Sequence, residues 1–478
     1  MIPLFFRLLG AQTVRPPNSV LLRASADGRY FENAYTEEPI RIKGDSAWTI
    51  VTELDLGEVR QYLDDRQARG FNLLIVQYTT PNQYSAGAHS PGAKELGGAL
   101  PFLKNISGGT WTGVFANHDA DFATPNDTYW DWVETILSEC ESRGMVVLGD
   151  YSYMGYNFGA TSGWWQTMMN AGNTQTVCYE FGLYLGERFR HHPNHVIDCG
   201  TDMFPVPASE GEARFMMMLT GLQDAGCRQQ LVSAHWARSS DARDEATFAS
   251  KITFNGVYPG VGSGGGFAPD YARCRSAYAR TPPVPCLAIE TEYEGEGTLT
   301  RYQVRALAWW GQLSSTAGYV FGSTIWTFSS GWPALLGTPA VLDMEQMMRF
   351  FDGLDWWKLV PNGLGSIGTL ITSGGGTSQT LGSPPGNEDS LSGYDYIAAA
   401  AAPDGSFLIA YVPDAHSGAF SIDMTKLSAS ALCEWVDPTS GGATTIGTFP
   451  NTGTHSFTVP ASANGAGDHD WVLRITVT

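Results

Sequence analysis

The stretch LGEVRQYLDDRQARGFNLLIV at residues 56–76 predicts an amphipathic helix that a glycine ends, followed at once by a buried strand. Leu56, Val59 and Leu63 recur at helical spacing, so they share one face of the helix. Gly70 is placed to stop the helix, because glycine readily takes the left-handed conformation found just past a helix end. Residues 71–76 are almost wholly apolar, which is typical of a strand covered on both faces.

The same unit recurs further along the chain. Residues 129–148, YWDWVETILSECESRGMVVL, show an apolar helical face, an Arg-Gly pair and an apolar strand. Helix-to-strand units in succession imply parallel strands, and eight expected strands predict an α/β fold, the (β/α)8 TIM barrel. A doubly wound open sheet is the alternative, but no GxGxxG turn follows the first strand. The eight strands are expected at 40–43, 71–76, 145–148, 195–199, 230–234, 252–257, 286–289 and 318–325.

The composition changes after Leu364. Residues 365–393 are rich in glycine and serine, which indicates a loop or linker. Short alternating runs with turn signals between them follow, and they predict a small antiparallel β-sandwich. We therefore expect an N-terminal extension at 1–27, a TIM-barrel catalytic domain at 28–364, the linker at 365–393 and the β-sandwich at 394–478.

The chain is strongly acidic. Its 478 residues carry 48 Asp and Glu against 28 Lys and Arg, a formal net charge of −20. Nucleic acid and an anionic membrane surface would be repelled, so neither is expected as a main partner, and no apolar run reaches the ~20 residues of a membrane span. A neutral carbohydrate would not be repelled by this charge. The 12% aromatic content also supplies Trp and Tyr residues whose rings can stack on sugars. A monomer is the favoured state.

The seven cysteines show no metal-binding spacing. Cys199 and Cys286 lie in expected strands and Cys140 in an expected helix, which favours buried free thiols over disulfides. The apolar N-terminal stretch is broken by Arg7 and has no basic segment before it, which makes it a poor secretory signal. A cytoplasmic location is therefore favoured over secretion or display at the cell surface.

Carboxylates follow two of the expected strands. Asp202 comes just after the fourth strand, and Glu290 begins the run ETEYE at the end of the seventh. In a TIM barrel the carboxyl ends of the strands form the active-site face, so both acids converge on one mouth. Two carboxylates across a cleft suggest glycoside hydrolysis, one as acid and one as nucleophile. Glu292 and Glu294 compete with Glu290, because alternate residues of a strand share a face.

Further polar and aromatic residues are expected at the same mouth. Aromatic faces stack on sugars, and Asp or His hydrogen-bonds hydroxyl groups. The two tryptophans after the first and eighth strands are equally compatible with barrel-top core, and the histidine with a bond to a backbone carbonyl. The candidates for substrate binding are Asp45, Trp48, Asp150, His235, Trp236, Tyr258, Glu292 and Trp326.

No metal or cofactor is expected. His191 and His192 follow a helix and are more readily explained as favourable charges at its C-terminus than as ligands. HExxH is absent, and no HxH follows the first strand, so a barrel metallohydrolase would lack its ligands. Neither a GxSxG elbow nor a P-loop is present.

Several segments resemble the apiosidase-like glycoside hydrolases, a TIM-barrel group. The resemblance runs from about residue 25 to the end of the chain. Its C-terminal part resembles the β-sandwich that follows this barrel in the family, labelled a collagen-binding domain. The segments are GRYFEN at 28–33, IKGDSAW at 42–48, LDDRQARGFN at 63–72, PNDTYW at 125–130, ETEYE at 290–294, AGYVFGSTIW at 317–326, WVDP at 435–438 and DWVL at 470–473.

The resemblance implies a retaining hydrolase of plant or microbial polysaccharide or oligosaccharide. It assigns Asp202 as acid/base and Glu290 as nucleophile. The chain departs from the family pattern at Thr201, where a second glycine is common, and at Thr291, where proline is common; these changes bear on apiose specificity more than on the reaction. A carbohydrate-binding or adhesion protein without catalysis is the alternative, and a pure binder has no need of both carboxylates.

Overall fold

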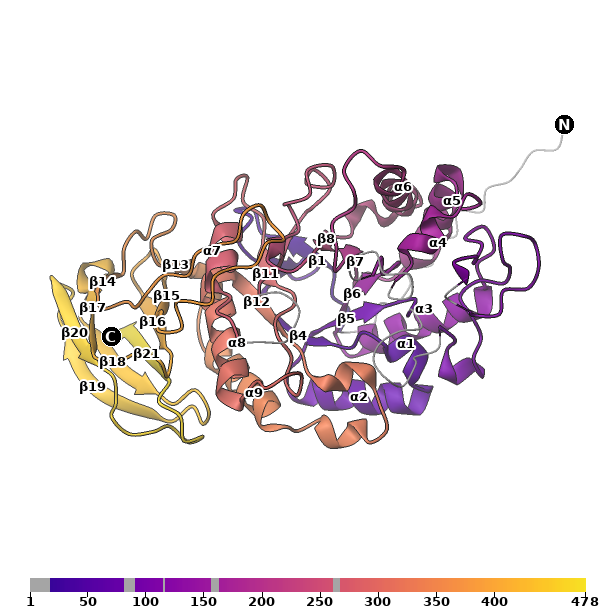
Figure 1. The fold of residues 1–478 in the computed structure, drawn as a ribbon. Helices are drawn as coiled ribbons and strands as arrows, with labels where there is room; N and C mark the ends of the chain where they lie inside the picture. Colours follow the sequence, from indigo (N-terminus) through magenta and orange to yellow (C-terminus); the bar gives the residue numbers. More distant parts are fainter. Residues whose placement is uncertain (1–17, 81–90, 115–116, 156–162, 261–266) are drawn as a thin grey trace.

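The computed structural model describes residues 18–80, 91–114, 117–155, 163–260 and 267–478. The chain forms a barrel and a C-terminal β-unit that lies at one end of the molecule, drawn in orange to yellow in Figure 1. None of the helices in the described ranges is long and apolar enough to cross a membrane.

The barrel is one nine-stranded sheet. Its first eight strands pair in parallel, and β9 adds to β10 in the antiparallel sense. The backbone N–H of Thr253, just before β10, donates to the carbonyl of Val232 on β8 at 2.9 Å, so the two sides of the sheet meet. The TIM barrel is confirmed. The strand order is β8 (Val232–His235), β7 (His195–Thr201), β6 (Val146–Asp150), β5 (Leu73–Gln77), β4 (Ile42–Ser46), β12 (Thr316–Phe321), β11 (Cys286–Ala288), β10 (Asn255–Tyr258) and β9 (Ser240–Asp241).

Helices cover the outside of the barrel (Figure 1). The helix expected from residue 56 begins where Asp55 and Glu58 form a capping box, and it ends before Gly70, whose φ is +87°. The helices are α1 (Ile50–Glu53), α2 (Leu56–Ala68), α3 (Asp127–Ser142), α4 (Trp165–Met169), α5 (Gln175–Phe189), α6 (Glu210–Asp224), α7 (Tyr271–Tyr278), α8 (Arg301–Ser315) and α9 (Pro339–Asp352).

The barrel interior is apolar at one end and polar at the other. Val196 on β7 and Leu148 on β6 belong to the apolar cluster inside the barrel. Because side chains alternate along a strand, Asp198 and Asp150, two residues further on, point into the same interior. The polar layer therefore lies at the carboxyl ends of the strands.

The first strand differs from its expected position. Residues Pro39–Ile40 form β3, which completes a separate antiparallel sheet with β1 (Leu22–Ala24) and β2 (Phe31–Asn33). The barrel strand β4 begins only at Ile42 and runs to Ser46. Asp45 therefore lies inside this strand and not after it.

The C-terminal unit is a β-sandwich of two antiparallel sheets around one apolar core. Two of its strands lie outside residues 394–478, the range expected for it. β13 precedes residue 364 and pairs with β15, and β14 lies within the segment expected to be a linker. The larger sheet has the order β13 (Val360–Pro361), β15 (Ala398–Ala401), β16 (Phe407–Val412), β21 (Trp471–Val477), β18 (Ala431–Val436) and β19 (Ala443–Phe449), and the smaller β14 (Ile371–Ser373), β17 (Ala419–Asp423) and β20 (Thr454–Thr458).

A shared core joins the two units. Trp309 of α8 stacks on Tyr411 of β16, with ring centroids 5.7 Å apart. The buried guanidinium of Arg305 on α8 contacts Asp343 of α9 at 2.8 Å and Asp470 of the sandwich at 2.6 Å. The sandwich is thereby fixed against one side of the barrel.

All seven cysteines lie within the described residues, and all are buried free thiols, as expected from the sequence. Cys140 lies on α3, and its pKa is raised to about 12 by burial. Thiols of this kind are inert packing groups.

Candidate active site

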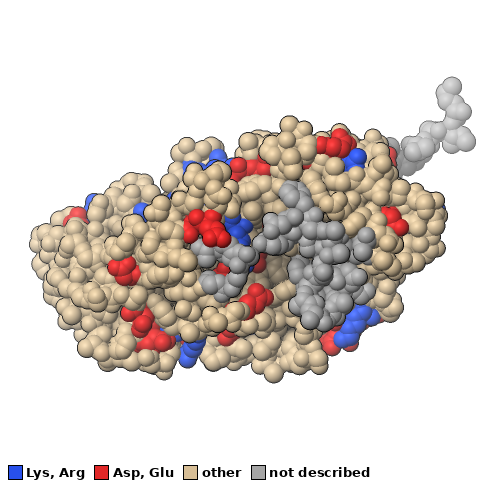
Figure 2. Space-filling model, in the orientation of Figure 1, with Lys and Arg blue, Asp and Glu red and all other residues tan. Residues whose placement is uncertain are grey.

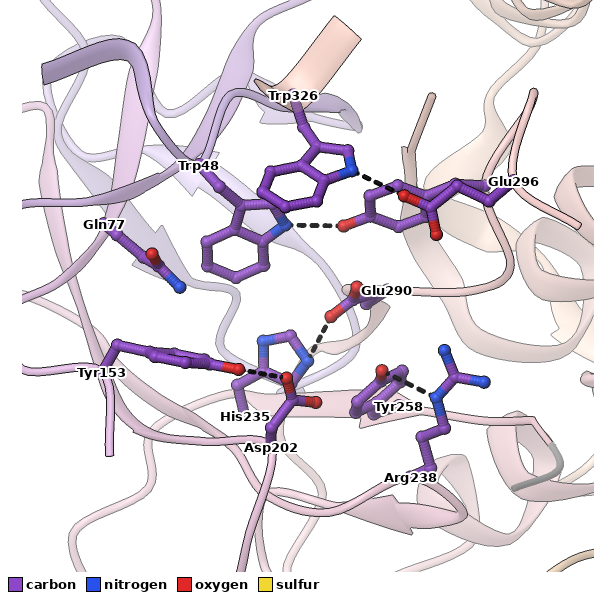
Figure 3. A pocket seen from close by; sticks show the side chains of 11 residues that line it. Trp48, Gln77, Tyr153, Asp202, His235, Arg238, Tyr258, Glu290, Glu296 and Trp326 are labelled. Carbon is purple, nitrogen blue, oxygen red and sulfur yellow. Dashed lines mark hydrogen bonds and ion pairs between the residues drawn. The ribbon is translucent and has the colours of Figure 1, made fainter. Parts of the chain in front are cut away.

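A pocket of about 160 Å³ opens at the carboxyl ends of the barrel strands. Figure 2 shows that this face of the molecule is hollowed near its centre, with acidic side chains around the hollow. Gln77, His235 and Tyr258 are the last residues of β5, β8 and β10, so each projects from a strand end into the pocket. The lining residues, drawn in Figure 3, are Trp48, Gln77, Tyr153, Asp202, His235, Arg238, Tyr258, Glu290, Tyr293, Glu296 and Trp326.

The structure brings the two predicted catalytic acids together in this pocket. A carboxylate oxygen of Asp202, a carboxylate oxygen of Glu290 and a ring nitrogen of His235 all lie within 4.8 Å of one another. Nε2 of His235 is 2.6 Å from Oε2 of Glu290, and the hydroxyl of Tyr153 donates to Oδ2 of Asp202 at 2.6 Å (Figure 3). The carboxylates thus face one space from two sides of the barrel.

The backbone turns sharply before Asp202. Gly200 has a φ of +81°, and a Cβ atom there would lie 1.9 Å from the ring of Trp236, so only glycine fits. The ladder between β7 and β8 shifts register here, between Asp198 and Thr201. Asp202 itself has a φ of +54°. This turn aims the Asp202 carboxyl at the pocket.

Burial and charge set the protonation of the site. Burial and the negative charge of Glu290 raise the pKa of Asp202 above its usual range. Burial alone would lower the pKa of His235, but the charge and hydrogen bond of Glu290, with the charges of Asp198 and Asp202, raise it to about 9. The raised pKa of Asp202 makes its protonated form more favourable than that of an ordinary aspartate, and His235 is positively charged at neutral pH.

The rings of Trp48, Tyr293 and Trp326 form an aromatic wall of the pocket. The indole N–H of Trp48 donates to the hydroxyl of Tyr293 at 2.6 Å, and that hydroxyl lies 3.0 Å from the Ser46 hydroxyl. The indole N–H of Trp326 donates to Glu296 at 2.6 Å. These bonds hold the indole rings at the pocket, where their faces are suited to stacking on a sugar.

Four of the eight residues expected to bind substrate line this pocket: Trp48, His235, Tyr258 and Trp326. Nothing in the structure tests sugar binding itself, so their role stays a prediction. The other four do not line the pocket that the described residues form.

Each of these four is held elsewhere by its neighbours. Trp236 points away from the barrel because it follows the inward-pointing His235, and its indole donates to the carbonyl of Ala242 at 2.9 Å. Asp150 is buried inside the barrel below the pocket. Glu292 is buried with its Oε1 2.6 Å from Arg238. Asp45 is buried behind the sheet, where the hydroxyl of Tyr62 donates to it at 2.6 Å and Arg66 forms an ion pair with it.

Replacing Asp45 with alanine is expected to lower the free energy of unfolding by about 3–5 kcal/mol, because the buried Arg66 charge loses its fully buried partner and keeps only the partly exposed Asp65. KM for any hydrolysed substrate should not change. Denaturant unfolding followed by fluorescence measures the first effect. Glu187→Gln is the control, since it breaks an exposed contact with Arg190 and should hardly change stability. A raised KM with unchanged stability would instead place Asp45 in the sugar site.

Sequence reasoning missed five lining residues: Gln77, Tyr153, Arg238, Tyr293 and Glu296. Gln77 ends β5, so the same strand-end rule that selected His235 identifies it once the strand boundary is known. Tyr153, Arg238 and Glu296 lie in loops, and no local pattern marks them.

Asp202, His235 and Glu290 are also the set of described residues whose atoms could hold a metal ion. In the structure His235 and Glu290 instead contact each other at 2.6 Å. Thr291, beside Glu290, does not line the pocket, because its hydroxyl is hydrogen-bonded to Tyr319 at 2.6 Å within the barrel wall. The departure from the family pattern at Thr291 therefore lies behind the pocket.

Comparisons with known proteins agree with this architecture. A search of curated sequences finds no match. A solved structure described as "Glycoside hydrolase" has a TM-score of 0.72 at 17% identity, with 96% of this chain and 97% of that chain covered. A glycoside hydrolase family 5 structure from Bacteroides vulgatus has a TM-score of 0.71 at 17% identity, with 95% and 93% covered. These likenesses concern the fold.

Two family models match the sequence itself. The model "Putative collagen-binding domain of a collagenase" matches residues 387–476, which form most of the β-sandwich. The model "Apiosidase-like, catalytic domain" matches residues 25–358, which include every strand of the barrel and every residue that lines the pocket. The chain therefore belongs to the apiosidase-like family, and it is a glycoside hydrolase.

Proposed function

We propose that the protein is a retaining glycoside hydrolase in which Glu290 is the nucleophile and Asp202 the acid/base. The observation that carries this proposal is the approach of the two carboxyl groups, with an oxygen of one within 4.8 Å of an oxygen of the other. Retaining enzymes hold their carboxyl groups about 5–5.5 Å apart, whereas inverting enzymes leave about 6.5–9.5 Å for a water molecule. The observed spacing supports direct attack by a carboxylate.

The first step breaks the glycosidic bond. The ionised carboxylate of Glu290 attacks the anomeric carbon, and the bond from that carbon to the leaving oxygen breaks as Asp202 gives this oxygen its proton. A covalent glycosyl ester on Glu290 results. In the second step Asp202, now ionised, takes a proton from water, whose oxygen attacks the anomeric carbon and releases Glu290. Two displacements at one carbon restore its original configuration.

The surroundings of Asp202 suit the acid role. Its pKa is raised by burial and by the charge of Glu290, which favours the protonated form needed at the start of the cycle. Once Glu290 carries the sugar ester, its charge is gone. The pKa of Asp202 then falls, so Asp202 stays ionised after giving up its proton and can accept one from water as the general base.

The pocket favours a neutral sugar. Asp202, Glu290 and Glu296 line it, and the guanidinium of Arg238 is already 2.6 Å from Glu292. His235, the other cationic group of the described lining, is likewise paired, with Glu290 at 2.6 Å, so a carboxylated sugar would have to compete with these acids for a cation. We propose a neutral glycan from a plant or a microbe, including furanosides of the apiose type, as the substrate class.

A panel of neutral and acidic polysaccharides and aryl glycosides tests this proposal. We expect reducing sugar to be released from a neutral substrate by the wild-type protein, and far slower release by Glu290→Gln or Asp202→Asn. Product analysis by chromatography identifies the sugar. Release by both variants at the wild-type rate, or cleavage of acidic glycans alone, would contradict the proposal.

A further inference from the structure

Two buried carboxyl groups lie beneath the pocket and are not part of the reaction described above. Asp198 on β7 and Asp150 on β6 are in register with each other, and both point into the barrel. Their exposed fractions are 0% and 1%. Both oxygens of Asp198 and Oδ2 of Asp150 have no hydrogen-bond partner in the structure. Burying a carboxyl group without hydrogen-bond partners destabilises a fold, so a functional role would explain why Asp198 and Asp150 lie here.

Asp198 faces His235, a pocket residue that contacts the proposed nucleophile. Its Oδ2 is 3.9 Å from Nδ1 of His235, and Nε2 on the other side of the same ring is 2.6 Å from Glu290. The ring itself is held between Trp48, with centroids 5.4 Å apart, and Tyr258, at 4.6 Å and nearly perpendicular. Asp198, His235 and Glu290 thus form a line from the barrel interior to the pocket.

We propose that Asp198 is a positioning residue for this enzyme: its carboxylate faces Nδ1 of His235 and stabilises the imidazolium, whose Nε2–H is directed at Glu290. This inference rests on the function proposed above. A negative charge behind a histidine stabilises the positively charged ring and favours one orientation of it, as in other sites where histidine acts between two partners. Glu290 is in turn held in one orientation.

The charges around His235 agree with this role. Burial raises the pKa of Asp198 to about 7, so Asp198 is largely ionised above that pH, where the pKa of His235 at about 9 leaves the ring positively charged. Burial, with the charge of Asp198, raises the pKa of Asp150 well above its usual range, which favours its neutral form. Titratable and charged groups surround the ring from each neighbouring element. They are Asp150 in β6, Asp198 in β7, Asp202 after β7, Arg238 after β8, Tyr258 in β10 and Glu290 after β11.

The test is the titration of His235 in Asp198→Asn, followed by NMR of protein labelled with ¹⁵N-histidine. The signal is assigned by its loss in His235→Asn. Removing a negative charge at 3.9 Å from Nδ1 is expected to lower the pKa of His235 by about one unit and, once the ring is neutral, to decrease the share of the Nδ1-protonated tautomer. Asp150→Asn is the matched control, because it replaces a buried acid of the neighbouring strand whose neutral form is favoured, so it should shift the titration far less than Asp198→Asn does.

Kinetics and stability separate positioning from a merely structural role. Asp198→Asn is expected to lower kcat on the order of tenfold with KM little changed, the scale of loss when the outer partner of a functional histidine is removed. The variant should unfold at no lower denaturant concentration than the wild type above pH 7, because it removes a buried charge. An unshifted His235 titration, or a kcat loss matched by Asp150→Asn, would overturn the inference.

Failure of this inference and failure of the proposed function give different results. If Glu290→Ala is inactive but Asp198→Asn leaves both the titration and kcat unchanged, only the role of Asp198 is wrong. If Glu290→Ala keeps its activity, the proposed nucleophile is wrong whatever Asp198 does.

Discussion

Replacing Glu290 with alanine is expected to lower kcat by roughly 10⁴-fold or more, the scale of loss when a catalytic nucleophile is removed. The anomeric carbon then has no carboxylate to attack it, and no glycosyl ester forms. Initial rates on the best substrate from the glycan panel measure the loss. The protein should stay folded, because Glu290 is partly exposed in the pocket and the substitution shortens a side chain that supports no core packing.

Small anions distinguish loss of a nucleophile from a general disturbance. Azide fits the space that the alanine leaves, and it should restore turnover of an activated aryl glycoside to give a glycosyl azide of inverted configuration. Glu292→Gln is the control, because this neighbouring acid is paired with Arg238 and does not line the pocket. Its loss of activity should be far smaller and insensitive to azide. The reverse pattern would make Glu292 the nucleophile.

Replacing Asp202 with alanine is expected to slow hydrolysis of natural glycosides by about 10²–10⁴-fold, the usual contribution of a general acid. An aryl glycoside with a good leaving group needs no protonation in the first step, so its first step should be nearly as fast as in the wild type. Rapid kinetics should then show a burst of released phenol followed by slow turnover, because the glycosyl ester on Glu290 lacks its general base.

The pH profile gives a second readout for Asp202. Burial and the charge of Glu290 raise its pKa, so Asp202 keeps its proton to a higher pH than an ordinary aspartate. For the wild type, kcat/KM on natural substrate should fall as the pH rises through this raised pKa, and the limb should vanish in Asp202→Ala. Glu296→Gln is the control; it should slow good and poor leaving groups by similar factors. If Asp202→Ala slowed substrates with good and with poor leaving groups by similar factors, Asp202 would not be the general acid.

The barrel could be predicted from sequence because each of its units carries redundant local signals. The segment from Leu56 to Val76 combines an apolar helical face, a capping acid, a terminating glycine and an apolar run, and all of them indicate the same structure. Strand ends then place Asp202 and Glu290 at one face by topology alone. This is why the two acids and four of the eight further candidates meet in one pocket.

The remaining candidates depend on strand register, which local patterns do not determine. Asp45 was expected after the first strand, but residues 39–40 pair with β2, and Asp45 then points outward to Arg66. A shift of one residue turns a side chain to the opposite face of the sheet. Trp236 is turned away from the pocket for the same reason. Tyr153 and Arg238 reach the pocket from loops, whose path depends on tertiary packing.

The anomeric configuration of the first product tests the central claim most directly. Hydrolysis of the identified substrate is followed by ¹H NMR from the first minutes, before the released sugar mutarotates. The account predicts that the anomer formed first has the configuration of the bond that was cleaved, because Glu290 and then water each invert the same carbon. Initial appearance of the opposite anomer would show a single displacement by water and would contradict the assignment of Glu290 as nucleophile.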